Sequence, residues 1–122
     1  MIDALRLLTQ NNRDLNDPRK MRQVLVYLNR HNVQVTLLQE THLKPHKNNR
    51  FARTRAAHQS FSSYSGYVHG TAILIRKGIP HRLLEEINDP EGRYNIIRIV
   101  LGTKPLIIIN TYGPNTGDSE FL

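Results

Sequence analysis

Polar residues of the kinds that bind cations and phosphate stand where apolar runs of this chain end. Three such runs end on polar groups, at Gln10–Asn12, Gln39–Thr41 and Asn110–Asn115. In sheet proteins, ligands commonly bind where strand ends converge, because loops there carry polar side chains on a rigid base. The carboxylate of Glu40 suits a hard cation. Mg²⁺ takes oxygen ligands and usually needs only one or two protein carboxylates, completing its shell with water and phosphate.

Each of these residues also has a simpler interpretation. A lone glutamate at a strand end is most often solvated or paired with a nearby lysine or arginine. Asn11 and Asn115 are ordinary turn residues by type. Tyr112 can pack its ring at the edge of a core, and His42 can be a solvated loop histidine. Residue types alone leave both interpretations open.

The distribution of charge indicates contact with a polyanion. The 122 residues carry 17 Lys or Arg against 10 Asp or Glu, a net charge of +7. From Thr41 to Leu84 there are eight Lys or Arg, five of the six histidines, and no Asp or Glu. A basic domain is the electrostatic footprint of a nucleic-acid binder. The alternative is a solvated basic loop without a partner, and we favour polyanion contact.

Composition excludes several classes of protein. The chain has no cysteine, which rules out disulfides and Cys-based zinc sites. No apolar run is long enough to span a membrane, and the first residues lack the pattern of a secretory signal. We therefore expect an intracellular protein without a membrane partner, forming one domain or part of one.

One helix is predicted near the start of the chain. Asp17 can cap the free N–H groups of a helix start, and Pro18 fits its first position. The spacing of apolar residues then follows a helical stripe, made of Met21, Val24, Leu25 and Leu28. His31–Asn32 are typical of a helix end.

The remaining pattern predicts strands. Residues 4–12 and 33–40 flank the helix and suggest a βαβ unit. Later strands are expected within 58–70, in 71–78, and as a hairpin over 93–115 turning at "GTKP", with a loop at 43–57 and a turn at 88–92. The expected fold class is α/β, a mixed, mostly antiparallel sheet with one clear helix. Because one helix cannot cover both faces of such a sheet, either further elements are missing or a second copy pairs with it.

Five segments in order resemble the endonuclease/exonuclease/phosphatase superfamily. The likeness is strongest to the apurinic-type endonuclease domain at the N-terminus of LINE-type retrotransposon polyproteins, which also contain a reverse transcriptase. The segments are "DLNDPRKMRQVLVYL" (14–28), "LLQETHL" (37–43), "GTAILIRK" (70–77), "EGRY" (91–94) and "IINTYGPNTG" (108–117). The resemblance implies a DNase I-like four-layer α/β sandwich. Residues 1–122 would form a single incomplete domain, its N-terminal half.

The same resemblance implies a site and a reaction. By it, Glu40 binds the catalytic Mg²⁺, with Mn²⁺ as an alternative, and Asn11 helps to form the metal and phosphate site. Tyr112 contacts the scissile phosphate and is, with Asn11, a catalytic residue. Asn115 and His42 are the further candidate contacts to DNA phosphate. The implied activity is Mg²⁺-dependent nicking of DNA, and the implied location is the nucleus.

Two departures from the family pattern bear on activity. Arg13 and Asp14 stand where relatives with "N-x-N-G-L-N" have the second Asn and the Gly. The later "G-D-x-N" and "S-D-H" motifs are absent, so we expect the C-terminal half, or a longer polyprotein, to be needed and nicking by these residues alone to be negligible. Whether the 122 residues are an enzyme therefore stays open. The alternatives are a catalytically inactive nucleic-acid-binding relic and a phosphatase of the same superfamily.

Overall fold

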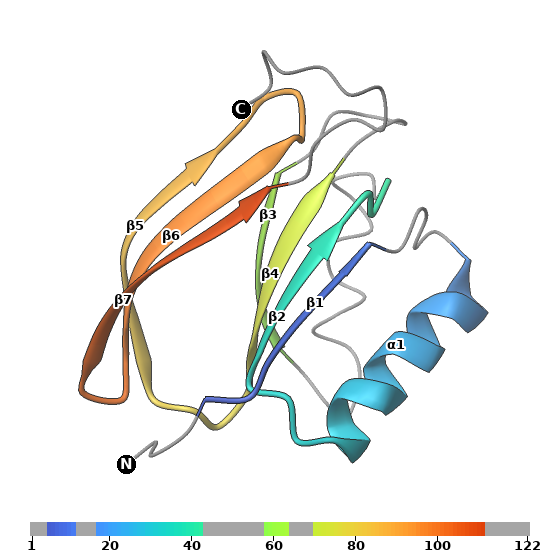
Figure 1. The fold of residues 1–122 in the computed structure, drawn as a ribbon, viewed down its shortest axis with the longest axis horizontal. Helices are drawn as coiled ribbons and strands as arrows, with labels where there is room; N and C mark the ends of the chain where they lie inside the picture. Colours follow the sequence, from blue (N-terminus) through green and yellow to red (C-terminus); the bar gives the residue numbers. More distant parts are fainter. Residues whose placement is uncertain (1–4, 12–16, 43–57, 64–69, 112–122) are drawn as a thin grey trace.

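The described part of the chain forms one helix and two β-sheets that face each other (Figure 1). The computed structural model describes residues 5–11, 17–42, 58–63 and 70–111, without the side chains of 18 and 58–63. Sheet A has the strand order β1-β2-β4-β3, and sheet B has the order β5-β6-β7. The elements are β1 (Leu7–Asn11), α1 (Pro18–Arg30), β2 (Val35–Gln39), β3 (His58–Ser63), β4 (Thr71–Arg76), β5 (His81–Asn88), β6 (Tyr94–Leu101) and β7 (Lys104–Thr111).

Helix α1 begins and ends as its sequence predicts. The side chain of Asp17 accepts a hydrogen bond from the backbone N–H of Arg19 at 2.9 Å, which satisfies one free donor of the first turn. At the other end, the backbone N–H of His31 donates to the carbonyl of Tyr27 at 3.1 Å. All members of the predicted apolar stripe are buried: Met21, Val24, Leu25 and Leu28. The stripe faces sheet A, so α1 covers the outer side of that sheet.

The pairing of β1 and β2 confirms the βαβ unit. These strands run parallel, joined by α1, and Asn11 lies in register with Gln39. Strand β4 pairs with β2 in the antiparallel sense, with Thr71 opposite Gln39. Sheet A is therefore mixed and sheet B is antiparallel, which confirms the predicted fold class.

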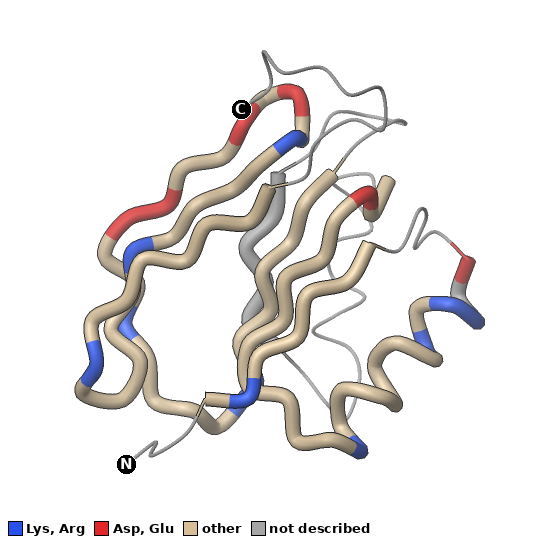
Figure 2. The backbone as a smooth tube through the Cα atoms, viewed as in Figure 1, with Lys and Arg blue, Asp and Glu red and all other residues tan. Residues whose placement is uncertain are grey.

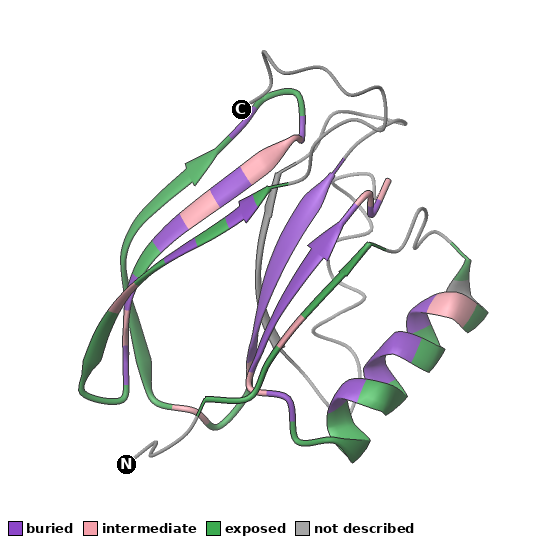
Figure 3. Ribbon diagram, in the orientation of Figure 1, coloured by how far each residue is buried: buried purple, intermediate pink, exposed green. Residues whose placement is uncertain are grey.

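Alternation along the strands builds two cores, one on each face of sheet A (Figure 3). On β2, Leu38 points toward α1, while Val35 and Leu37 point toward sheet B. The core under the helix contains Met21, Val24, Leu25, Leu28, Val33, Leu38, Ala72 and Leu74. The core between the sheets contains Val35, Leu37, Ile73, Ile75, Ile97, Ile99, Leu101 and Ile108. Burial on both faces explains why β2 and β4 are almost continuously apolar.

Sheet B differs from the expectation in two respects. The predicted hairpin is present, but β7 begins within "GTKP", which leaves only Gly102 and Thr103 as the turn. Strand β5 was not predicted, because all of its residues are exposed and its sequence shows no clear alternation. The division of the strands between two sheets agrees with the four-layer sandwich that the resemblance implies. Among the described residues none covers the outer face of β7, where Ile107 is 66% exposed.

Candidate functional site

The polar ends of several strands meet at one end of the two sheets (Figure 1). Because β1 and β2 are parallel and in register, Asn11 stands beside Gln39, the residue before Glu40. Strand β4 runs in the opposite direction, so its first residue, Thr71, lies on the other side of Gln39. The last residues of β7 reach the same end. The predicted convergence of polar residues at strand ends is thus present for Asn11 and Glu40.

Glu40 leaves the strand in an unusual backbone conformation. Its φ is +53°, in the left-handed region that residues other than glycine seldom adopt, and His42 has the same φ. The backbone on either side is held, since the N–H of Thr41 donates to the carbonyl of Gly70 at 3.1 Å. Gly70 in turn donates to the carbonyl of Gly92 at 3.0 Å. Such conformations persist where the surrounding structure determines them, and they are concentrated at functional sites.

Buried polar side chains form the end of the inter-sheet core next to Glu40. Asn110 is 0% exposed, and its Nδ2 donates to the carbonyls of Leu38 and Ala72, each at 3.0 Å. Its Oδ1 accepts a hydrogen bond from Gln39 Nε2 at 2.8 Å. Thr71 Oγ1 is buried at the same end of the core, and no described residue is its hydrogen-bond partner. The end of the inter-sheet core is therefore polar, whereas its middle is aliphatic.

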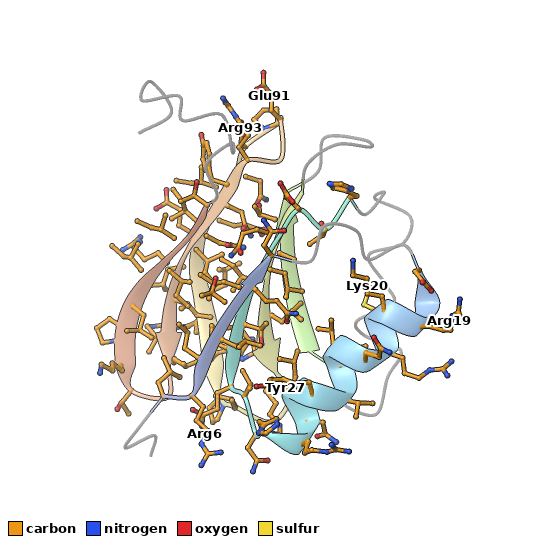
Figure 4. All side chains as sticks on the ribbon, turned by 45° about the vertical axis from the view of Figure 1, so that its right-hand side comes forward. Arg6, Arg19, Lys20, Tyr27, Glu91 and Arg93 are labelled. Atoms are coloured by element: carbon orange, nitrogen blue, oxygen red, sulfur yellow. The ribbon has the colours of Figure 1, made fainter. Side chains whose placement is uncertain are left out.

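A clamp formed by Asp89 and Arg93 closes the turn between β5 and β6 at this end of the sheets. The buried Asp89 accepts hydrogen bonds from Arg93, through its backbone N–H at 3.0 Å and its Nε at 2.9 Å. The hydrogen bond from the Arg93 side chain holds the pKa of Asp89 below its usual value, against the opposing effect of burial. Glu91 lies 3.3 Å from the same Nε, at the tip of the turn (Figure 4). The hydroxyl of Thr111 donates to the carbonyl of Arg93 at 3.4 Å, which links this turn to the end of β7.

An open groove of about 620 Å³ lies between β1 and α1. It is lined by Leu8, Thr9, Gln10, Asn11, Lys20, Gln23, Val24 and Tyr27. Figure 4 shows Lys20 and Tyr27 on the side of α1 that faces β1. The groove reaches Asn11, so it adjoins the candidate site along the edge of sheet A.

The described charges are distributed unevenly around the site (Figure 2). Glu40 and the acidic turn between β5 and β6 lie at the same end of the sheets. Arg76 is the last residue of β4, at the opposite end of that strand, and Lys77 follows it. Arg76 donates to the side chains of Asn32 and Asn29 at 3.0 and 3.2 Å. The basic residues of the stretch from Thr41 to Leu84 that the structure describes therefore do not border the site. Those from Lys44 to Arg55 lie outside the described residues.

Several predicted features lie beyond what the structure describes. Tyr112 and Asn115 are outside the described residues, as is the departure at Arg13 and Asp14. Within ranges 5–11, 17–42, 58–63 and 70–111, no group of three or more His, Cys, Asp or Glu is arranged to hold a metal ion. In the same part of the chain, no helix is long and apolar enough to cross a membrane.

Sequence reasoning missed the residues that support the site from below. Gln39 and Asn110 are noted in the sequence only as polar strand ends, and Asp89 only as part of a turn. A local signal exists for the first two. Each continues an inward-facing series of apolar residues, Val35 and Leu37 before Gln39, and Ile108 before Asn110. A polar residue in such a series is one to examine for buried hydrogen bonds.

Comparison with known families identifies the chain. Residues 5–118 match the Endonuclease/Exonuclease/phosphatase family. Because this match includes nearly all of the sequence, the chain belongs to that family.

Solved structures share the fold at low sequence identity. An AP endonuclease from Leishmania major, LMAP, superposes with a TM-score of 0.70 and 18% identity, over 96% of this chain and 42% of that one. D. rerio TDP2, in complex with a single-strand DNA product, gives 0.68 and 19% identity over 95% and 49%. An AP endonuclease from Archaeoglobus fulgidus gives 0.62 and 20% identity over 91% and 42%. These likenesses confirm the DNase I-like fold, and the chain spans about half the length of the proteins concerned.

Proposed function

We propose that this member of the endonuclease/exonuclease/phosphatase family carries the metal-binding part of a Mg²⁺-dependent, DNA-nicking endonuclease of the LINE retrotransposon type. The observation that carries the proposal is that Asn11 lies in register with Gln39, the residue directly before Glu40. Asn11 ends β1 and Glu40 directly follows β2, so an amide oxygen and a carboxylate are available at the same end of sheet A. Neighbouring β-strands are a rigid base for such a pair, and rigid placement is what a cation site requires.

The residues present fit a hard divalent cation. Both donors are oxygen atoms, and Glu40 is partly exposed, so a cation can reach it from solvent. Glu40 forms no ion pair with any residue in the described part of the chain. Mg²⁺ commonly keeps several waters and is completed by substrate phosphate, so one carboxylate and one amide suffice where a zinc site would need more protein ligands. Mn²⁺ prefers similar oxygen donors and is an alternative.

The proposed chemistry is cleavage of a phosphodiester bond. A cation at Glu40 would neutralise charge on the phosphate oxygens and the leaving group. The chain's own residues would hold and orient the phosphate, with Asn11 and Tyr112 in catalytic roles and Asn115 and His42 as further contacts. The end of β7 at Thr111 supports this assignment, because Tyr112 follows it directly.

DNA is the proposed partner, and the nucleus the proposed location. The net charge of +7 favours a polyanionic substrate, and one similar structure is that of TDP2 with a DNA product. We also propose that residues 1–122 are an incomplete domain. The "G-D-x-N" and "S-D-H" motifs are absent, and the chain spans 42% to 52% of the similar structures. We therefore expect cation and DNA binding to be measurable where nicking is not.

The decisive experiment is titration of the chain with Mn²⁺, followed by electron paramagnetic resonance. We expect one site that Mg²⁺ displaces and that Glu40→Gln weakens at least about tenfold, because the amide replaces the charged ligand. Glu91→Gln is the matched control, since it removes the same charge from the same end of the molecule. Equal affinity in the wild type and Glu40→Gln would disprove the assignment.

A second candidate function is binding of nucleic acid without catalysis. The absence of the two later motifs favours it. The two functions are separated by supercoiled-plasmid nicking in Mg²⁺, with EDTA and Glu40→Gln as controls, and by DNA affinity measured at several salt concentrations. Salt-dependent binding that survives Glu40→Gln, with no nicking by the wild type, would favour the binder. Nicking that disappears in both controls would show that these residues carry their own chemistry.

A further inference from the structure

We infer that the buried amide pair Gln39–Asn110 is a positioning device, which aligns the two sheets so that Glu40 and its neighbours form one site. The inference rests on the proposed function, because the site that the pair positions is the proposed cation site. Neither residue is proposed to touch the cation or the substrate. Both act through the backbone and side chains that they hold.

Asn110 joins the two sheets through three hydrogen bonds of its side-chain amide. It belongs to β7 in sheet B, and its Nδ2 donates to two carbonyls of sheet A, those of Leu38 on β2 and Ala72 on β4. Its Oδ1 accepts from Gln39 Nε2. A flipped amide would place Oδ1 against two carbonyl oxygens, so the orientation of this side chain is determined. A change in the spacing of the sheets would break several bonds together.

Gln39 extends the connection to a third strand of sheet A. Its Nε2 donates to Thr9 Oγ1 at 2.9 Å, and more weakly to the carbonyl of Leu37 at 3.3 Å. One network, buried except at Thr9, therefore joins β1, β2, β4 and β7. Each side chain of the network lies one or two residues before a proposed site residue. Thr9 precedes Asn11 by two residues, and Gln39 directly precedes Glu40. Asn110 precedes Tyr112 by two residues.

Packing alone does not explain this pair. Directly below it, the inter-sheet core is aliphatic, with Ile97 and Ile108 both buried. A well-packed apolar pair would be expected to support the same fold, since exchanging buried polar partners for apolar groups of the same shape is often nearly neutral. Hydrogen bonds add direction and register, which apolar contacts lack. That property is needed at the end of the sheets that carries Glu40, and not in the middle of the core.

The test compares Asn110→Leu with Ile108→Ala. The control lies on the same strand, faces the same core and is 8% exposed, so it loosens packing without touching the amide network. The first readout is Mn²⁺ affinity at a temperature where both variants are folded. The second is hydrogen exchange of the Thr41 amide, whose bond to Gly70 holds the Glu40 turn. If Asn110→Leu does not fold, Gln39→Met serves instead, because it leaves Asn110 bonded to Leu38 and Ala72.

We expect Asn110→Leu and Gln39→Met each to weaken Mn²⁺ binding about tenfold, as supporting residues of metal sites commonly do, and to speed exchange at Thr41. Ile108→Ala should change neither readout, although it lowers global stability. If all variants changed both readouts in proportion to lost stability, the pair would be structural only and the inference would be wrong. If the wild type bound no Mn²⁺ while Thr41 exchanged faster only in the amide variants, the proposed function would fail and the positioning of the turn would stand.

Discussion

Asp89 and Arg93 are joined twice through a single carboxylate oxygen. Oδ2 of Asp89 accepts from the backbone N–H of Arg93 and from its Nε, at 3.0 and 2.9 Å. The turn between β5 and β6 is therefore closed by a charge that is only 4% exposed. Through Gly92 and Gly70, this turn is connected to the backbone that carries Glu40.

The interaction of Asp89 with Arg93 should stabilise the folded state at neutral pH and lose this effect in acid. Because folding lowers the pKa of Asp89 below its ordinary 3.8, the charged form contributes stability at all pH values above that. The contribution disappears as the pH falls through the lower, folded-state pKa. Asp89→Asn should lower the free energy of unfolding by roughly 1–3 kcal/mol at neutral pH, and by much less at pH 2. Urea titration at several pH values measures the difference.

The control for this prediction is the exposed pair Glu85–Arg98, whose side chains are 55% and 54% exposed. Glu85→Gln should cost at most about 1 kcal/mol, since solvent screens such pairs. A similar effect of Glu85→Gln and Asp89→Asn would contradict a special role for the buried carboxylate.

The N-cap of α1 should contribute about 1 kcal/mol to the free energy of unfolding. Asp17→Ala removes the acceptor for the Arg19 N–H, and such losses typically cost 0.5 to about 2 kcal/mol. Asp17→Ser keeps an acceptor at the same position and should stay close to the wild type. Equilibrium denaturation of the two variants checks the prediction, which is wrong if both are equally stable.

Adjacent isoleucines on β7 should respond very differently to truncation. Ile108 is 8% exposed and packs between the sheets, whereas Ile107 is 66% exposed on the outer face. Ile108→Ala should cost about 2–5 kcal/mol, because it removes buried surface and leaves a cavity. Ile107→Ala should change stability by less than about 0.5 kcal/mol. Thermal or urea unfolding of the two variants tests which face of sheet B is the core.

The left-handed conformation of Glu40 predicts a separation of stability from binding. Glu40→Ala and Glu40→Gly both remove the carboxylate, so both should lose the Mn²⁺ site. Only glycine adopts a φ of +53° without steric cost, so Glu40→Gly should be more stable than Glu40→Ala by about 1 kcal/mol. Paired unfolding measurements decide this, and a less stable glycine variant would show that the conformation carries no strain.

The order of elements was largely predictable, because short-range patterns specify it. Asp17 and Pro18 mark the start of α1, and the stripe that includes Met21 and Leu28 marks its buried face. The strands with strong apolar character were found by the same logic. Strand β5 was not, since its exposed residues show no alternation and its pairing with β6 includes a register shift between Leu83 and Glu85.

The candidate site was predictable only in part. Asn11 and Glu40 were named from residue type and resemblance, and the parallel register of β1 and β2 pairs Asn11 with Gln39, the residue before Glu40. The partnership of Gln39 and Asn110 was not predicted, because 71 residues separate them and no local pattern pairs two distant amides. The clamp of Asp89 on Arg93 is short-range, but its burial depends on the surrounding sheets.

The sequence by itself thus determined the helix, most strands, the basic charge and the residues with the chemistry to bind a cation and phosphate. These follow from propensity, periodicity and side-chain type, which act over a few residues. Only the tertiary structure decided which strands form each of the two facing sheets, and that Asn110 joins those sheets next to Gln39, the residue before Glu40. The reason is physical: which buried donors meet which acceptors depends on how apolar faces from distant segments pack together.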